Sequence, residues 1–526
     1  NRIKASDSGC SFWWLEYGGR MDTVHESQDI KKELWKVTYG IWDYIKNSGK
    51  FPEAENLTLE WVGMIPGKRE SRRFDGDYML RQSDIIEQKT FDDAVSFGGW
   101  AVDLHPADGV YTDISPCNQY HSKGVYQIPW RCMYSRNVDN LFLAGRLISV
   151  SHVAFGSTRV MMTSAHGAQS VALGAKICLQ KGISPRELGQ TENIEGFQRE
   201  LIRTGQFIPF LDQKDKEDLI HKAVLKASSV LALSELPGSG TFEFVDDPKG
   251  ILLPLPSGNL PIMEFTIKSK QLQILRVQLR KAVKVGNFSP EIILEEQKIS
   301  ISAGQSDLRV KLTYQEDKNF YGLLTFIPEH PYEMETSSIT LPGLLSLYHE
   351  LNDKVAKSVI QEAPEGSGIH SFEFWLPHRR PMGMLPAVKF SRALRAFSPA
   401  GVTGGYERPS HQDFGWVPDL EDKTPSLTAR WKNPVKASEV ILCFDTDFDN
   451  AMETVQVGHA VRHMPNCVRH FCLRDQNGRI LMEDRNNYQS RKVLKLAAGT
   501  EFSELKLEIL STWGAPPAVF RIRVLP

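Results

Sequence analysis

The hydrophobic pattern of this chain changes near residue 235, and the change divides the sequence into two kinds of structure. Beyond that point, Leu275, Val277 and Leu279 alternate with polar residues, and residues 308–314 repeat the pattern. Alternation with a period of two places the apolar side chains on one face of a strand, which is typical of antiparallel sheets that bury one face. The C-terminal half is therefore predicted to form antiparallel β-sandwiches.

Two sandwiches are expected in this half. Residues 233–361 form the first, with a helix predicted over 343–357 from the spacing of its leucines. The segment EAPEGSG, residues 362–368, has the composition of a linker. Residues 369–526 return to strands, such as the apolar run VILCF at 440–444, and form the second sandwich.

Residues 1–232 have a different pattern and are predicted to form a mixed α/β domain. Apolar residues recur there at three- and four-residue spacing, which indicates amphipathic helices. The predicted elements are a helix over 28–47 that begins near Ser27, a buried strand over 141–144, a helix over 159–178 that ends near Gly182, and helical stretches over 194–230, including one over 215–227.

Composition excludes several classes of protein. The 526 residues carry a formal net charge of −2, so bulk electrostatics do not favour nucleic acid. No apolar run approaches the roughly 18 residues of a membrane-spanning helix. The seven cysteines are scattered and form no disulfide framework. The N-terminus shows no signal-peptide pattern, and the sequence gives no localisation.

The stretch around residues 140–178 raises a specific question about ligand binding. A short apolar run ends at Gly145, and a helix rich in Gly, Ala and Ser follows. A glycine at the end of a strand lets a ligand approach the backbone, and the amides at a helix start favour an anionic or polarised ring edge. A tightly packed α/β layer without a ligand explains the same pattern, so both interpretations stay open.

Four stretches together resemble the FAD-dependent oxidoreductase family that is found in many bacterial genomes. Residues 140–176, NLFLAGRLISVSHVAFGSTRVMMTSAHGAQSVALGAK, resemble its C-terminal flavin-contacting segment. GMIPGKRESRRFDGDYML (63–80), FGGWAVDLHP (97–106) and the aromatic motif with its helix (12–47) resemble three further segments in the same order. The resemblance covers about 190 residues and implies a two-electron flavin reaction on a small organic substrate.

One part of the family pattern has no counterpart in this sequence. The G-x-G-x-x-G of a dinucleotide-binding βαβ unit is absent, because PGSGTFE has Glu243 and EGSGIHS has Ser371 at the third glycine position. The chain is therefore expected to begin after the AMP-binding half of the flavin domain. FAD is the cofactor that the resemblance implies for the complete protein, and we expect this chain alone to bind it poorly.

The resemblance also implies roles for individual residues. Ala144, Gly145 and Arg146 would lie beside the flavin chain. The backbone of the next motif would face the pyrimidine edge of the ring and stabilise its negative charge when it is reduced. The residues of that motif are Gly156, Ser157, Thr158 and Arg159.

Three residues are candidates for catalysis. His152 is the candidate acid–base group, because imidazole titrates near neutral pH, although a structural hydrogen bond explains it equally well. Arg159 is expected to clamp a substrate carboxylate or to supply a fixed charge, with a structural ion pair as the alternative. Glu16, between Trp14 and Tyr17, is expected to be a carboxylate in an apolar wall with a raised pKa. His105 either lines the pocket or caps a turn.

Metal sites are not expected. His459, His463, Cys467, His470 and Cys472 follow no familiar zinc spacing. The D-x-D-x-D-N string at 445–450 has Asn450 and Gln456 where a helix–loop–helix calcium site needs Gly and Glu, which leaves a looser calcium site open. The segment 416–431 loosely resembles galactose-binding-like sandwiches. Its tryptophans are expected in the core.

Two functions are consistent with the sequence. The first is the C-terminal part of a flavin-dependent oxidoreductase that transfers a hydride to or from a small organic or carbohydrate-related substrate. The second is a cofactor-free protein that binds a glycan or another protein through its sandwiches. A hydrolase is disfavoured because the sequence lacks G-x-S-x-G and shows no paired carboxylates that share one cleft.

Overall fold

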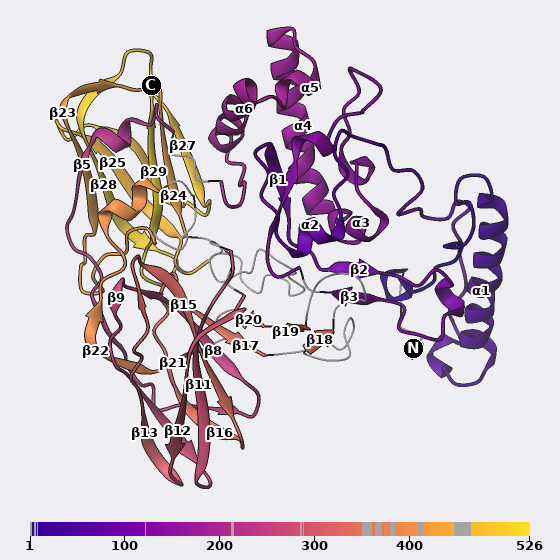
Figure 1. The fold of residues 1–526 in the computed structure, drawn as a ribbon, viewed down its shortest axis with the longest axis horizontal. Coiled ribbons are helices and arrows are strands. Elements are labelled where there is room, and N and C mark those ends of the chain that lie inside the picture. The colour runs from indigo at the N-terminus through magenta and orange to yellow at the C-terminus, as the bar shows by residue number, and fades with distance from the viewer. Residues whose placement is uncertain are drawn as a thin grey trace. The chain divides into compact units, whose positions relative to one another are not determined.

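A computed structural model gives the fold of the chain as two compact units. It describes residues 3–4, 7, 9–120, 122–211, 215–284, 287, 289–349, 360–362, 371–373, 375–378, 384–404, 407, 414–445 and 464–526. The N-terminal unit comprises 1–122, 126–197 and 351–372, and the C-terminal unit comprises 123–125, 198–350 and 373–526. Figure 1 traces the chain by residue number.

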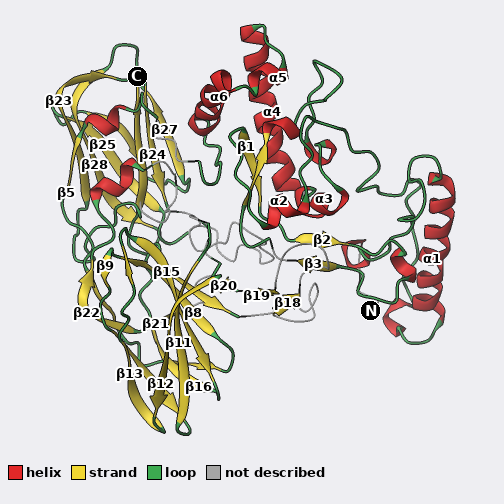
Figure 2. Cartoon of the chain, in the orientation of Figure 1, coloured by secondary structure: helices red, strands yellow, loops and turns green. Residues whose placement is uncertain are grey.

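The N-terminal unit contains helices and short antiparallel strand pairs. Strand β1 (Ala94–Gly98) pairs with β4 (Tyr126–Pro129), and β2 (Val102–Leu104) pairs with β3 (Asn118–Tyr120). The helices are α1 (Ser27–Asn47), α2 (Gln82–Ile86), α3 (His152–Thr158), α4 (Met161–Lys181) and α5 (Pro185–Leu188), and α6 (Thr191–Arg203) begins in this unit and ends in the C-terminal unit. In the part of the chain that is described, every α-helix lies before residue 204. Figure 2 labels these helices and colours them red. No helix among the described residues has the length and apolar character needed to cross a membrane.

Helix α4 explains why residues 161–181 are poor in bulky side chains. Its buried positions are Gly167, Ser170, Gly174 and Cys178, which recur at three- and four-residue spacing. A side chain at Gly174 would collide with the ring of Trp130, and the Ser170 hydroxyl donates a 2.7 Å hydrogen bond to the Val95 carbonyl of β1. The small residues therefore let the helix lie directly against the strand pair.

Two antiparallel sheets form the middle sandwich of the C-terminal unit. One contains β6 (Leu233–Leu236), β7 (Phe242–Val245), β10 (Met263–Ser269), β13 (Gly304–Val310), β16 (Tyr332–Ser337), β21 (Leu385–Pro386) and β22 (Val388–Leu394). The other contains β8 (Lys249–Leu255), β11 (Gln273–Lys281), β12 (Ile292–Ile301), β15 (Phe320–Pro328), β17 (Leu345–Tyr348) and β20 (Leu376–His378). Phe265 of one sheet meets Phe326 of the other edge to face, with ring centroids 5.0 Å apart.

Two further sheets form the last sandwich. A five-stranded sheet orders β26 (Ile480–Asp484), β25 (Val468–Asp475), β28 (Glu501–Thr512), β23 (Ser426–Lys436) and β5 (Val224–Ala227). A three-stranded sheet orders β27 (Arg491–Lys495), β24 (Glu439–Phe444) and β29 (Val519–Leu525). Trp416 and Trp431 are buried in the core between them, as predicted.

Several predicted elements are confirmed. The helix over 28–47 is α1, and the helix over 159–178 is α4, which ends at the left-handed Gly182. The alternating residues Leu275, Val277 and Leu279 are all buried in β11. The fold class, a mixed α/β part followed by two antiparallel sandwiches, is therefore correct.

Three local predictions are wrong. Residues 345–348, inside the predicted helix over 343–357, form strand β17, because they pair with β8 at the centre of a sheet; residues 350–359 lie outside the described part of the chain. The predicted helix over 215–227 is a short 3-10 turn followed by strand β5. The predicted strand over 141–144 is reduced to one bridge between Phe142 and Tyr134.

The strand pairing also crosses two of the predicted domain boundaries. Strand β5 precedes residue 233 but pairs with β23 of the last sandwich. Strand β22 follows residue 369 but pairs with β6 and β10 of the middle sandwich. Along the chain, one strand of the last sandwich (β5) therefore comes first, the strands of the middle sandwich follow, and the remaining strands of the last sandwich come at the end.

Candidate active site

A cluster of charged side chains around His105 is the most concentrated chemistry in the N-terminal unit. Asp103 lies on β2 and His105 follows two residues later, so the pleat directs both side chains to one face. Asp103 is 9% exposed and the His105 side chain is 14% exposed. We call Glu16, Arg69, Asp103, His105, Cys117 and Arg159 the His105 cluster.

The two ring nitrogens of His105 have different partners. Nδ1 lies 2.7 Å from Glu16 Oε2, whereas Nε2 lies 3.3 Å from a nitrogen of Arg69 and 3.4 Å from an oxygen of Asp103. A neutral ring that donates from Nδ1 to Glu16 keeps its Nε2 lone pair for another group. Trp13 places its ring edge-on to the imidazole at 6.0 Å.

Glu16 reaches the cluster because of a tight backbone contact. The Val110 amide donates a 2.7 Å hydrogen bond to the Glu16 carbonyl. Gly109 lies against the same carbonyl with φ +56°, where a side chain would both strain the backbone and collide with it. Glu16 also forms an ion pair with Arg69, so the predicted apolar wall around this carboxylate is wrong: its neighbours are charged.

Helix α3 brings Arg159 to the cluster. A Cβ on Gly156 would lie 2.7 Å from the Asp103 carbonyl oxygen, so only glycine allows α3 to pack this closely on β2. Arg159 stands at the C-terminal cap of α3, and its guanidinium donates a 2.6 Å hydrogen bond to Asp103 Oδ2. The other Asp103 oxygen accepts a hydrogen bond from the Cys117 thiol at 2.9 Å.

The environment sets the ionisation of the cluster. Burial acts to lower the pKa of His105, but hydrogen bonds and charge from Asp103 and Glu16 outweigh it and raise the pKa. Burial acts to raise the pKa of Asp103, but His105, Cys117 and Arg159 together lower it. Burial and Asp103 raise the pKa of the Cys117 thiol to about 12, which keeps this thiol protonated near neutral pH.

The sequence-predicted catalytic residues separate into two groups. Glu16 and Arg159 lie in the His105 cluster, 2.7 and 3.4 Å from the imidazole. His152 lies elsewhere: its Nδ1 is 2.8 Å from a Glu70 oxygen and its side chain is 67% exposed. Burial, together with the charge of Arg73, lowers the pKa of His152.

Some of the predicted cofactor-binding residues make contacts within the chain itself. Arg146 donates hydrogen bonds to the carbonyls of Lys68 and Arg69, which fixes the backbone that carries Arg69. Ser157 is fully buried and its hydroxyl lies 2.6 Å from that of Tyr126. Gly145 has φ +66°, and a Cβ added to it would meet no atom within 4 Å, so its surroundings are open.

Residues 156–158 were expected to precede a helix, but they form the last residues of α3. The helix that supplies the expected first-turn amides begins at Met161 and is α4. The first hydrogen bond of α4 runs from the Ser164 amide to the Val160 carbonyl at 3.0 Å. The amides of residues 161–163 therefore project from the N-terminus of a 21-residue helix. The turn at Gly145–Leu147 packs beside the same helix.

Sequence reasoning missed Asp103, Arg69 and Cys117. The D-x-H spacing carries a signal for Asp103, because residues two apart on a strand share a face. Cys117 approaches only because β3 pairs with β2, with Leu104 opposite Asn118. Arg69 approaches through a loop, and no local pattern of the sequence predicts that contact.

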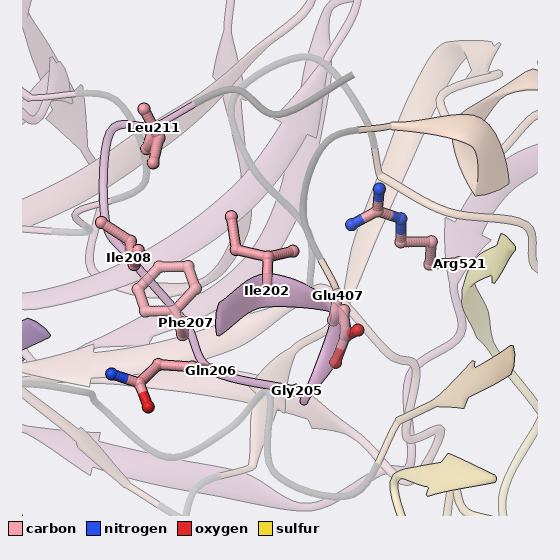
Figure 3. A pocket seen from close by; sticks show the side chains of 8 residues that line it. All are labelled: Ile202, Gly205, Gln206, Phe207, Ile208, Leu211, Glu407 and Arg521. Carbon is pink, nitrogen blue, oxygen red and sulfur yellow. The ribbon is translucent and has the colours of Figure 1, made fainter. Parts of the chain in front are cut away.

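The C-terminal unit has surface hollows of its own. One cavity has a volume of about 30 Å³. Figure 3 labels the residues that line it: Ile202, Gly205, Gln206, Phe207, Ile208, Leu211, Glu407 and Arg521. This volume accommodates about two water molecules. A wider groove of about 440 Å³ lies on the last sandwich, between residues 418–425 and 509–517.

The motifs discounted as metal sites are only partly described by the structure. His459, His463 and residues 446–450 with Gln456 lie outside the described residues. Cys467 and Cys472 are buried, and His470 lies 3.0 Å from a Glu483 oxygen. Among the described residues, Asp103, His105 and Cys117 form the group with metal-ligand spacing.

Comparisons with known proteins give one family and several partial structural likenesses. Residues 2–201 match the family model described as FAD dependent oxidoreductase. No curated protein matches the chain.

Among solved structures, the family 32 carbohydrate-binding module from Streptococcus pneumoniae EndoD is 13% identical, with a TM-score of 0.19, over 24% of this chain and 85% of that one. The family 32 module from C. perfringens NanJ, solved with galactose, is 12% identical, with a TM-score of 0.19, over 25% of this chain and 86% of that one.

Proposed function

Residues 2–201 carry the FAD dependent oxidoreductase domain, and from this premise we propose that the chain takes part in a two-electron, flavin-dependent oxidation or reduction of a small organic substrate. The observation that carries the proposal is the His105 cluster, which holds an imidazole between two carboxylates and two guanidinium groups. A flavin accepts or donates a hydride, and the substrate must lose or gain a proton when the hydride moves.

The proton is the part of this chemistry that the chain's own residues handle. His105 Nε2 accepts the proton from a substrate hydroxyl or amine, and the reverse reaction returns it. Glu16 orients the ring through Nδ1 and stabilises the imidazolium that results. Arg69, with a side chain that is 41% exposed, is the cation available to an anionic group of the substrate.

The residues around Gly145 fit the ring of a flavin. No atom lies within 4 Å of a Cβ built on Gly145, so a flat group would be able to approach the backbone there. The turn that holds Gly145 packs on α4, and the first-turn amides of this helix would supply donors for a polarised ring edge. No G-x-G-x-x-G is present to hold the pyrophosphate. Gly145, Arg146 and the first turn of α4 are therefore the residues proposed to hold the ring.

Two measurements test this proposal. The purified chain is titrated with FAD and bound flavin is followed by absorbance and by quenching of flavin fluorescence. Small alcohols, amines and sugars are then screened for reduction of the bound flavin. We expect weak saturable FAD binding, and reduction by at least one substrate class that His105→Asn slows at least tenfold while leaving FAD affinity unchanged.

The control variant is His25→Asn, because His25 is exposed and pairs with a neighbouring acidic residue in the same turn. Its reduction rate should equal that of the wild type. Absence of saturable FAD binding, or His105→Asn reacting at the wild-type rate, contradicts the proposal. Loss of activity only in His152→Asn would reassign the proton transfer to His152.

A second proposed function belongs to the last sandwich, where the groove of about 440 Å³ offers space for a saccharide. Asp419, Lys423 and Ser511 supply polar groups, and Leu420 and Leu510 supply exposed apolar surface. Affinity electrophoresis through gels that contain soluble polysaccharides tests this. Retardation that Lys423→Ala and Leu510→Ala both reduce supports it, and unretarded migration in every gel contradicts it.

A further inference from the structure

Three side chains of the His105 cluster have the chemistry and spacing of a transition-metal site. Asp103, His105 and Cys117 each offer one ligand atom, and these atoms lie within 4.8 Å of one another. His105 Nε2 is 3.4 Å from Asp103 Oδ1, and Cys117 Sγ is 2.9 Å from the same oxygen. Ligands about 2.1 Å from a tetrahedral zinc ion are separated by about 3.4 Å, so the ion fits with small movements.

We propose that Asp103, His105 and Cys117 bind a zinc-like divalent transition-metal ion, with a fourth position open to solvent or substrate. The set supplies one carboxylate oxygen, one imidazole nitrogen and one thiolate sulfur. Thiolate and imidazole ligands favour zinc or cobalt(II) over magnesium or calcium, which prefer oxygen. This assignment departs from the expectation of no metal, which rested on linear spacing alone.

The surrounding residues already supply the outer contacts that such a site needs. Glu16 accepts from His105 Nδ1 at 2.7 Å, which directs Nε2 toward the metal position. A carboxylate behind a ligating histidine is the common arrangement at zinc sites. Arg159 holds Asp103 Oδ2 at 2.6 Å and leaves Oδ1 to face Cys117 and His105.

Charge balance requires two changes when the ion binds. The Cys117 thiol loses its proton to solvent, so binding strengthens as pH rises. The guanidinium groups of Arg69 and Arg159 lie 3.3 and 3.4 Å from His105 Nε2, and both must move away from this nitrogen. Arg69 can keep its ion pair with Glu16, because its side chain is 41% exposed, and Arg159 can keep its hydrogen bond to Asp103 Oδ2. The bound ion then takes the Nε2 lone pair, and on the proposed function it blocks proton transfer by His105.

Cobalt(II) spectroscopy tests the site without any assay of activity. The metal-free chain is titrated with CoCl₂ under anaerobic conditions. We expect one equivalent to give visible bands of a tetrahedral ion and a near-ultraviolet band from thiolate to cobalt, and zinc should bleach both. Cys117→Ala should lose the near-ultraviolet band and bind cobalt at least tenfold more weakly, and Asp103→Asn should also bind more weakly.

The matched control is Cys472→Ala, which removes a buried cysteine near His470 in the last sandwich. It should keep the wild-type spectrum. Circular dichroism and thermal unfolding establish that each variant is folded, and a variant that fails is replaced by Cys117→Ser. A wild-type spectrum without a thiolate band, or one that Cys117 variants leave unchanged, overturns the proposal. Loss of the band in Cys472→Ala places the metal in the last sandwich and overturns it as well.

Discussion

Asp103 is the residue on which the His105 cluster depends. It is 9% exposed and ionised, and it accepts hydrogen bonds from Arg159 and Cys117. A buried carboxylate needs such partners, because the loss of its hydration is compensated only by pairing and hydrogen bonds. The sequence motif D-x-H indicates that Asp103 and His105 share a face. It does not indicate Arg69 or Cys117, whose approach depends on contacts between distant segments.

Removing Arg159 should show how far the stability of the fold depends on the ion pair of Asp103. Arg159→Ala leaves the Asp103 carboxylate buried without its guanidinium partner, so we expect the free energy of unfolding to fall by about 3 kcal/mol. Urea denaturation measures it. Arg20→Ala, which removes an exposed ion pair with Asp108, is the control and should change stability little. Equal effects of the two variants would contradict the buried role of Arg159.

Stability should also depend on pH through His105. Its pKa is raised in the folded state, so its protonation stabilises the fold fully below the unfolded pKa of about 6.5. That contribution is lost as pH rises through the folded pKa. Urea midpoints measured from about pH 5 to pH 9 should therefore decline above pH 6.5 in the wild type. The decline should be smaller in His105→Asn, and parallel profiles for the two proteins would refute this origin.

At the scale of elements, glycine positions decide how close helices come to strands. Helix α4 was predictable because its small residues recur at helical spacing from Gly167 to Cys178. The strand at residues 345–348 was not predictable, because leucines at these positions fit a helix or a buried strand equally well. Only the pairing with β8 decides that this segment is a strand. Helix α3 was missed because seven residues carry too little periodicity.

Gly156→Ala tests the packing of α3 on β2. The added methyl group would lie 2.7 Å from the Asp103 carbonyl oxygen, so we expect a loss of about 1–3 kcal/mol in stability and a displaced Arg159. Gly196→Ala in α6 is the matched control, because nothing lies within 4 Å of its Cβ position. It should raise stability by about 0.5–1 kcal/mol. Thermal unfolding of both variants distinguishes a specific clash from a general effect of alanine.

On the scale of the whole molecule, the order of segments along the chain differs from their order in space. Period-two patterns correctly predicted that the C-terminal half forms two sandwiches, because alternation is a local property. They did not predict that β5 joins the last sandwich or that β22 joins the middle one, because a local pattern does not specify the pairing partner of a strand. In Figure 1 β5 carries the colour of the first half of the chain beside later strands.

A buried network of ion pairs links the segment before β5 to the last sandwich. Arg523 of β29 is fully buried and donates a 2.6 Å hydrogen bond to Asp215, and its Nε lies 3.4 Å from Asp218. Asp218 also accepts from the Val524 amide at 2.9 Å. The network therefore fixes the segment that leads into β5 against the last strand of the chain.

Arg523→Leu should destabilise the last sandwich by about 3 kcal/mol, because it leaves the buried Asp218 without its guanidinium partner, whereas Asp215 keeps its ion pair with Arg203. Urea denaturation followed by tryptophan fluorescence measures this loss, and Trp416 and Trp431 in the core of that sandwich contribute to the signal. Arg430→Ala, which removes an exposed ion pair with Glu504, should have little effect. An unchanged midpoint in Arg523→Leu would show that the network contributes nothing to stability.

The early position of β5 has a consequence for synthesis on the ribosome. Its neighbour β23 begins at Ser426, 199 residues after β5 ends at Ala227. At about 5–20 residues per second, β5 waits roughly 10–40 s for its partner while the whole middle sandwich emerges between them. During nascent-chain growth its unpaired edge is open to wrong partners, and chaperone binding is most useful in that interval.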